Sequence, residues 1–195
     1  MYTFVVTIAR LLVRLVWGLN VQGLEHIPRD TGAIIAGNHT SWFDPVVIAA
    51  AIKRPIHFMG KAELFENPVL RWFFSRLHAF PVKRGQADRE AIRTSQELVT
   101  AGHLLGVFPE GTRNKTKEAL LPLQGGATLI AIKTGVPVVP VVVVKSARRL
   151  LRRPYRVMIG APIDLGGPKK ATKIDIAQGN EAISVQFSSL LSRNN

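Results

Sequence analysis

Two short motifs contain residue types that together could transfer a proton and bind a phosphate. The first, residues 38–44, reads Asn-His-Thr-Ser-Trp-Phe-Asp and places a carboxylate five positions after His39. A carboxylate that binds one imidazole nitrogen fixes the ring tautomer and leaves the other nitrogen available as a general base. The second motif, residues 108–113, reads Phe-Pro-Glu-Gly-Thr-Arg. Its glycine permits a tight turn and close approach of a ligand to the backbone, and its arginine offers a rigid fork of donors for a phosphate.

Each motif also has a purely structural interpretation. Asp44 could be only a helix cap and His39 a hydrogen-bonded corner residue, and the pair Glu110 and Arg113 could be a surface ion pair of little value. With five His and 13 acidic residues in the chain, a His-x4-acid pair also arises easily by chance. It is the presence of both motifs in one chain that favours a functional site.

Local geometry restricts how His39 and Asp44 could meet. Five positions on an unbroken helix rotate two side chains by about 500°, so the pair can meet only if residues 39–44 form a turn. Asp44 and Pro45 are typical of an N-cap and a first helical position, and an apolar segment at residues 32–37 precedes the motif as a buried strand. We therefore expect His39 at a strand-to-helix corner, with one oxygen of Asp44 capping the helix and the other binding His39.

Alternating strand and helix patterns along the chain predict an α/β fold. We expect a single domain with a mostly parallel or mixed central sheet flanked by helices. The expected strands are residues 32–37, 55–59, 80–82, 104–108, 136–144 and 156–159, and the expected helices are residues 45–52, 68–77, 88–101, 125–133 and a last segment with its apolar face at 183–191. The β-branched run at 136–144 suits only a central or fully buried strand.

Basic residues follow three of these expected strands. Lys61 follows the second, Lys83 and Arg84 follow the third, and Arg113 follows the fourth. If these strands are neighbours in the sheet, the cations converge at one edge. The chain as a whole has a formal charge of +13, which indicates an anionic partner: nucleic acid, anionic lipid, a phosphate-bearing substrate or an acidic protein. The absence of cysteine excludes disulfides, thiolate metal sites and a cysteine nucleophile.

The first 19 residues predict a helix that lies on a membrane surface. From Phe4 to Leu19 the segment is apolar except for a narrow stripe at Thr7, Arg10, Arg14 and Gly18. Sixteen helical residues rise about 24 Å, less than the roughly 30 Å of a bilayer core, so we expect the helix not to cross the membrane. The arginines also disfavour a cleaved signal peptide. The alternative is a helix packed on the protein's own core.

The motifs resemble those of the glycerolipid acyltransferase family. Residues 38–44 are similar to its first block, the His-x4-Asp motif, and residues 80–84 (Phe-Pro-Val-Lys-Arg) to its second. Residues 108–113 and 136–141 resemble its third and fourth blocks, and the resemblance extends from about residue 20 to 165. One departure is Leu123-Gln124-Gly125, which stands where many relatives carry an aromatic residue and a lysine.

The resemblance implies a glycerol-3-phosphate acyltransferase-like fold and an enzyme that moves a fatty acyl group from a thioester, on coenzyme A or acyl carrier protein, to a lysophospholipid. The implied acceptor is the sn-2 hydroxyl of 1-acyl-glycerol 3-phosphate, which gives phosphatidic acid; another lysolipid or glycerol 3-phosphate itself is the alternative. His39 would remove the hydroxyl proton and Asp44 would orient His39. The implied substrate-binding residues are Lys61, Arg84 and Arg113 for the phosphate, Glu110 near the glycerol, and also Gly111 and Thr112.

This interpretation includes no cofactor and no metal. His26, His57, His78 and His103 lack the spacing of metal ligands and are expected to be structural. We expect residues 1–19 to anchor the protein to anionic lipids at the cytoplasmic face, and residues 20–195 to form the acyltransferase domain.

Two alternative functions do not involve catalysis. A basic nucleic-acid-binding module is suggested by the charge alone, because no aromatic-basic platform or recognition helix is found. A non-enzymatic lipid-binding protein with the same fold is the other.

Overall fold

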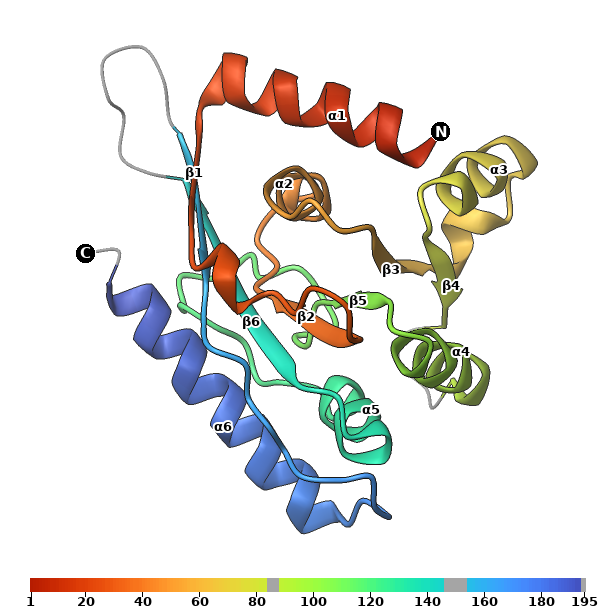
Figure 1. Ribbon diagram of the computed structural model, residues 1–195, viewed down its shortest axis with the longest axis vertical. Coiled ribbons are helices and arrows are strands. Elements are labelled where there is room, and N and C mark those ends of the chain that lie inside the picture. The colour runs from red at the N-terminus through yellow and green to blue at the C-terminus, as the bar shows by residue number, and fades with distance from the viewer. Residues whose placement is uncertain (84–87, 146–153, 194–195) are drawn as a thin grey trace.

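A central seven-stranded sheet organises the computed structural model, which describes residues 1–83, 88–145 and 154–193 (Figure 1). The strand order is β1-β7-β6-β2-β5-β3-β4. The β6–β7 pair is antiparallel, and the other described pairs are parallel. The strands are β1 (Leu19–Gln22), β2 (Ala33–Gly37), β3 (Ile56–Lys61), β4 (Phe80–Val82), β5 (Leu104–Val107), β6 (Val138–Lys145) and β7 (Tyr155–Ile159). The predicted α/β class with a mostly parallel or mixed sheet is confirmed.

Helices cover both faces of the sheet. On one face lie α1 (Tyr2–Leu12), which continues through a π-helical turn at Val13–Trp17, and α2 (Asp44–Ala51). On the other lie α4 (Arg89–Thr100), α5 (Gly126–Thr134) and α6 (Lys173–Ser192). A 3₁₀ turn at Ala62–Phe65 and helix α3 (Pro68–Arg76) connect β3 to β4, and a second 3₁₀ turn spans Leu24–His26.

The two hydrophobic cores meet through the central strands. In β2, Ile35 packs among the residues of α2, whereas Ile34 packs among those of α5 and α6, as the two-residue repeat of a strand requires. Residues 138–143 of β6 are buried on both faces, so the prediction of a central strand for this β-branched run is confirmed.

Two elements differ from the sequence-based prediction. Strand β1 was not predicted, because its four residues alternate between half-buried and exposed and directly follow the apolar N-terminal run. Helix α6 begins ten residues before Ile183, at a capping box in which Thr172 and Asp175 bond each other's backbone N–H groups. Its first turns are mostly exposed, so they carry no apolar stripe that would mark a helix.

The N-terminal helix packs on the protein by one narrow side and leaves a broad apolar face uncovered. Val13 is buried, and Arg10 donates hydrogen bonds to the carbonyls of Ala50 and Ile52 at the end of α2, at 2.6 and 3.3 Å. The outer face exposes Phe4, Ile8, Leu11, Leu12, Leu15 and Val16. Among the described residues, no helix is both long and apolar enough to cross a membrane.

A row of four rings joins the start of α1 to the sheet. Tyr2 stacks on His78 at 4.5 Å between ring centroids, His78 stacks on His57 of β3 at 4.7 Å, and His57 lies 5.0 Å from His103. The Tyr2 hydroxyl also accepts a hydrogen bond from the backbone N–H of Ile56, 3.1 Å away. Burial, followed by the neighbouring imidazoles of His78 and His103, lowers the pKa of His57 to about 4.

Candidate active site

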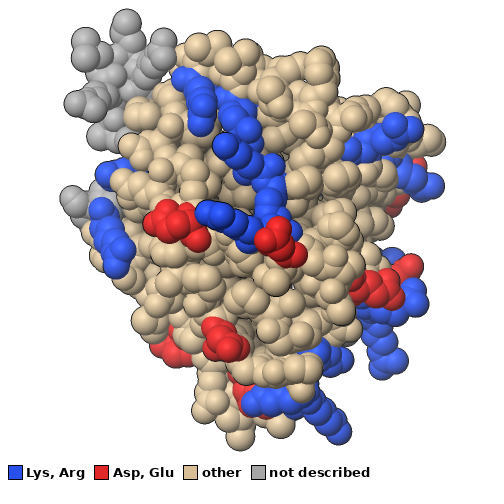
Figure 2. All heavy atoms as spheres, viewed as in Figure 1, with Lys and Arg blue, Asp and Glu red and all other residues tan. Residues whose placement is uncertain are grey.

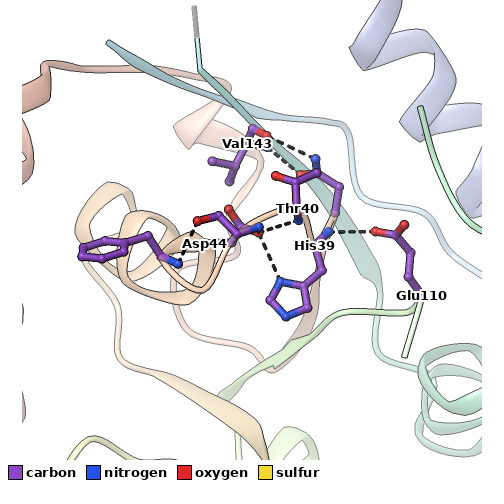
Figure 3. Close-up of polar contacts among 8 residues, drawn as sticks. His39, Thr40, Asp44, Glu110 and Val143 are labelled. Carbon is purple, nitrogen blue, oxygen red and sulfur yellow. Dashed lines mark hydrogen bonds and ion pairs between the residues drawn. The ribbon is translucent and has the colours of Figure 1, made fainter. Parts of the chain in front are cut away.

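The residues after β2 turn back on themselves and bring His39 to Asp44. His39 Nδ1 lies 3.1 Å from Asp44 Oδ2, and the backbone N–H groups of Thr40 and Ser41 donate to the same oxygen at 2.7 Å each (Figure 3). Asp44 is 1% exposed and His39 7% exposed. The prediction that residues 39–44 form a turn is therefore confirmed, and the Nδ1 contact leaves Nε2 as the ring nitrogen that can exchange a proton with a substrate.

One detail of that prediction was wrong. We expected one oxygen of Asp44 to cap the helix and the other to bind His39, but Oδ2 accepts all three bonds. The N-cap position belongs to Phe43, which makes no side-chain capping bond, and Asp44 is already the first helical residue. From this position its carboxylate folds back over the preceding turn instead of capping the helix ahead of it.

The second motif and Asn114, the residue after it, hold the backbone of His39 on both sides. Glu110 Oε1 accepts the N–H of His39 at 2.7 Å, and the N–H of Asn114 donates to the carbonyl of His39 at 2.6 Å. The other carboxylate oxygen, Glu110 Oε2, accepts the N–H of Leu121 at 2.9 Å. Glu110 is 3% exposed, so both of its oxygens serve the backbone within the protein. Its predicted contact with the glycerol of a substrate stays a prediction.

Strand order explains why the motifs meet. Strands β2 and β5 are parallel neighbours with Ala36 opposite Val107, so the chains that leave them at residues 38 and 108 emerge side by side. Parallel strands end at the same edge of a sheet, where open α/β folds place their sites. Asn38 strengthens this edge from the other side, because its side-chain amide exchanges two hydrogen bonds with the backbone of Val143 in β6.

Phe108 forms one wall of the site, a role that sequence reasoning did not assign. Its ring stacks on the imidazole of His39, with centroids 4.1 Å apart and planes inclined by 22°. Gly37 makes room for this ring, because a Cβ at that position would lie 3.1 Å from Phe108 Cε1 and 2.9 Å from Ile48 Cδ1. The only signal available in the sequence was the position of Phe108 at the start of the second motif.

Gly111 turns the chain with a φ of 69°, a conformation that favours glycine. A Cβ there would also meet Gln124 Cγ at 3.0 Å. Gln124 belongs to the segment that departs from the family pattern, and its N–H donates to the carbonyl of Pro109 at 2.6 Å. The departure at residues 123–125 thus lies directly against the second motif. Thr112, beside this turn, is exposed.

Arg113 is brought to the His39 turn by an aromatic contact. Its guanidinium carbon lies 4.3 Å from the ring centroid of Trp42, and Trp42 stands three residues after His39. Stacking on an aromatic face leaves the edge of a guanidinium free to bind an anion. Neither partner was predicted for the other, because the two residues are far apart in the chain.

Two of the other predicted cations, Lys61 and Lys83, follow strands that end at the same sheet edge. Strands β5, β3 and β4 are parallel neighbours, as the hypothesis of converging cations requires. Lys61, at the end of β3, makes a 2.9 Å ion pair with Glu63, and Lys83 follows β4 with its side chain exposed. Arg84 lies outside the described residues. In the described ranges, no group of three or more His, Asp or Glu side chains is placed to hold a metal ion.

The known proteins that resemble this chain in sequence and in fold are acyltransferases. The family model described as "Acyltransferase" matches residues 18–144. The chain is 33% identical to a 1-acyl-sn-glycerol-3-phosphate acyltransferase of Bacillus subtilis (strain 168), over 84% of this chain and 82% of that one. A protein of the same name from Streptococcus pneumoniae is 32% identical over 92% of this chain and 70% of that one. The fold matches the crystal structure of the 1-acyl-sn-glycerophosphate acyltransferase PlsC of Thermotoga maritima with a TM-score of 0.71 and 25% identity, covering 97% of this chain and 80% of that one.

Proposed function

The chain belongs to the acyltransferase family, and from this premise we propose that it esterifies the sn-2 hydroxyl of 1-acyl-glycerol 3-phosphate with a fatty acyl group taken from a thioester. The product is phosphatidic acid, a precursor of phospholipids. The names of its relatives support the acceptor. The observation that carries the proposal is the buried pair of His39 and Asp44, with the backbone of His39 bonded by Glu110 of the second motif and by Asn114.

Chemistry begins at Nε2 of His39. This nitrogen takes the proton of the acceptor hydroxyl as the oxygen attacks the thioester carbonyl, and a tetrahedral intermediate forms. When the C–S bond breaks, the leaving thiolate takes the proton back from Nε2, so that an ester and a free thiol result. Asp44 holds Nδ1–H throughout and places a negative charge beside the imidazolium that forms transiently. Phe108 keeps the ring plane fixed between these steps.

For the acceptor's phosphate we propose Arg113 as the principal ligand, with Lys61 and Arg84 adding positive charge. Support comes from the stacking of Arg113 on Trp42, which orients the guanidinium next to the His39 turn. Gly111 and Thr112 would line the approach to the glycerol. Glu110 would act mainly by placing His39, since its two oxygens already accept backbone N–H groups.

The thioester donor is proposed to be acyl-coenzyme A or acyl-acyl carrier protein. Both donors are acidic, and the formal charge of the chain is +13. Figure 2 shows a row of Lys and Arg side chains that runs from the upper left to the middle of the face in view. The proposal needs no metal, no cofactor and no covalent acyl-enzyme.

Membrane association through α1 completes the proposal, because both the acceptor and the product are lipids. The exposed face of α1 and of the π-helical turn that follows it carries six large apolar side chains, and Trp17, in the same turn, contacts Phe43 of the His39 turn at 5.9 Å between centroids. Trp42 and Phe43 are themselves exposed. An apolar path therefore connects the helix to the site. We propose a monotopic arrangement at the cytoplasmic face, where both thioesters are available.

A panel assay with the purified full chain tests this function. Each of the two thioesters is paired with 1-acyl-glycerol 3-phosphate, with lysophospholipids that carry other head groups, and with glycerol 3-phosphate, and free thiol release is measured. We expect the highest kcat/KM for 1-acyl-glycerol 3-phosphate, and none for the variant His39→Ala. A clear preference for another acceptor would overturn the substrate assignment, and turnover retained by His39→Ala would overturn the mechanism.

A vesicle assay tests the role of α1. Removing residues 1–19 would also remove the buried side chains of Tyr2 and Val13, so the triple variant Phe4→Ser, Leu11→Ser, Leu15→Ser is preferable. It should float far less with anionic vesicles than the unchanged chain. Equal flotation would show that α1 is not the anchor.

A further inference from the structure

Helix α3 exposes an apolar surface that packing within the protein does not explain. Val69 is 72% exposed and Trp72 54%, and Leu70 and Phe73 are exposed as well. None of the nine residues of α3 is buried. The helix nevertheless begins with a well-formed cap, because Asn67 Oδ1 accepts the N–H groups of Val69 and Leu70. Exposed apolar side chains of this size, gathered on one short element, are typical of a surface that meets another apolar phase.

The charges on α3 and on the segment that follows it suit an anionic bilayer. Arg71 and Arg76 are basic, and the described stretch from residue 67 to residue 83 contains no Asp or Glu. Arg76 lies over the ring of Trp72, with its guanidinium carbon 5.5 Å from the ring centroid. An aromatic ring with an arginine beside it is typical of the membrane interface, where the ring enters the lipid and the cation stays with the phosphates.

The C-terminal end of α3 lies near the start of α1. His78, two residues beyond the end of α3, stacks on Tyr2 at the start of α1. Figure 1 likewise places the N-terminus beside α3. In Figure 2 the upper edge of the molecule over α1 is free of charged side chains, basic side chains lie below the left end of α1, and the charges over α3 are mostly basic. Residues 1–24 contain two arginines and no acidic residue, so α1, like α3, carries basic but no acidic side chains.

We propose that α3 is a second membrane-binding element, which inserts Val69 and Trp72 into the interface of an anionic bilayer while α1 lies on the same bilayer. The proposal rests on the membrane association of α1 proposed above. A second helix beside the start of α1 restricts rotation of the protein about the axis of α1, which a single helix lying on the surface does not. The active site, at the carboxyl ends of β2 and β5, then keeps a constant distance from the bilayer that supplies the acceptor.

Trp72 itself can report on this contact. Replacing Trp17 and Trp42 by Phe leaves Trp72 as the sole tryptophan of the chain. On addition of vesicles that contain an anionic phospholipid, we expect its emission to shift to shorter wavelengths and to be quenched by lipids with brominated acyl chains. Vesicles of phosphatidylcholine alone should produce a smaller effect. Unchanged emission of Trp72 in a protein that floats with the vesicles overturns the proposal and leaves the role of α1 intact.

Flotation of a second variant gives an independent measurement. This variant keeps Trp17 and Trp42. The pair Val69→Ser, Trp72→Ser should lower the vesicle partition coefficient about tenfold, since each lost apolar contact weakens binding. The matched control is Ile174→Ser, Val185→Ser on α6, which removes two exposed apolar side chains from a distant helix. The control should float like the unchanged chain, and circular dichroism checks that both pairs fold.

Four further outcomes overturn the proposal. An equal loss of flotation in the α3 pair and the α6 pair would mean that any exposed apolar group contributes. A shift of Trp72 emission with protein concentration, in the absence of vesicles, would assign the surface to a second copy of the chain. A shift caused by a soluble acyl thioester without vesicles would assign it to the acyl chain of the donor. Absence of any vesicle binding by the unchanged chain would overturn the membrane roles of α1 and α3 together.

Discussion

Replacing Asp44 by Asn should separate the electrostatic role of this carboxylate from its structural role. Oδ2 alone accepts the bonds from His39, Thr40 and Ser41. The single amide oxygen of Asn can take the place of Oδ2 and keep all three bonds, whereas Ala keeps none. The Asn variant therefore retains the turn and loses the negative charge beside the imidazole.

The expected magnitude follows from the distance between the two groups. At the 3.1 Å separation of Nδ1 and Oδ2, a carboxylate and an imidazolium attract each other by about 5 kcal/mol at an effective dielectric constant of roughly 20. A neutral oxygen retains about half of this, because charge-assisted hydrogen bonds are roughly twice as strong as neutral ones. About 2.5 kcal/mol of transition-state stabilisation is lost, which corresponds to a decrease in kcat of about 100-fold.

The assay measures kcat and KM from thiol release and the free energy of unfolding from urea titration. Asp44→Asn should lower kcat with little change in the acceptor KM and should destabilise the fold less than Asp44→Ala, which leaves two backbone donors unpaired at about 1 to 3 kcal/mol each. Asp175→Asn, in the capping box of α6, is the matched control and should keep full turnover. A kcat of Asp44→Asn within threefold of the unchanged chain, or a large rise in KM alone, would refute this reasoning.

Three other positions lead to further predictions. Glu110→Gln should lower kcat more than it raises KM, because one of the two backbone N–H groups that Glu110 accepts would face an amide NH₂; a change confined to KM, measured in the same thiol assay, would instead make Glu110 a substrate ligand. Gly111→Ala should cost about 1 to 3 kcal/mol of strain at φ 69° together with the contact to Gln124, and an unfolding free energy and kcat equal to those of the unchanged chain would contradict it. His57 has its pKa lowered to about 4, whereas in the unfolded chain it binds a proton near pH 6.5; its contribution to stability is therefore complete above pH 6.5 and is lost as the pH falls from 6.5 toward 4. Urea titrations across this window should show a smaller loss of stability in His57→Phe than in the unchanged chain.

Sequence reasoning reached the main elements of the site because their signals are local. The helix rotation between positions 39 and 44 required a turn, and the turn is present. The predicted helix at 68–77 is present as α3, and the run at 136–144 marked a central strand. These signals depend on a few neighbouring residues and on the burial of side chains with a fixed period, so they can be recognised in one chain without knowledge of its partners.

Contacts between segments that are distant in the chain could not be predicted from such local signals. The bond from His39 to Glu110 spans 71 residues, and the stacking of Arg113 on Trp42 is equally remote. Both depend on β2 and β5 being parallel neighbours, which the order of strands in the sheet decides. The uncovered face of α3 depends in the same way on which helices pack over which strands.

The amino-acid sequence by itself therefore determined where most strands and helices of this protein form, β1 and the first turns of α6 excepted, and which residue types could carry its chemistry. Tertiary structure alone decided that Glu110 and Asn114 hold the backbone of His39 and that Phe108 stacks on its ring. The physical reason is that turns, caps and periodicity follow from local sterics and hydrogen bonds, whereas the neighbours of a strand are selected by the burial of apolar surface over the whole chain.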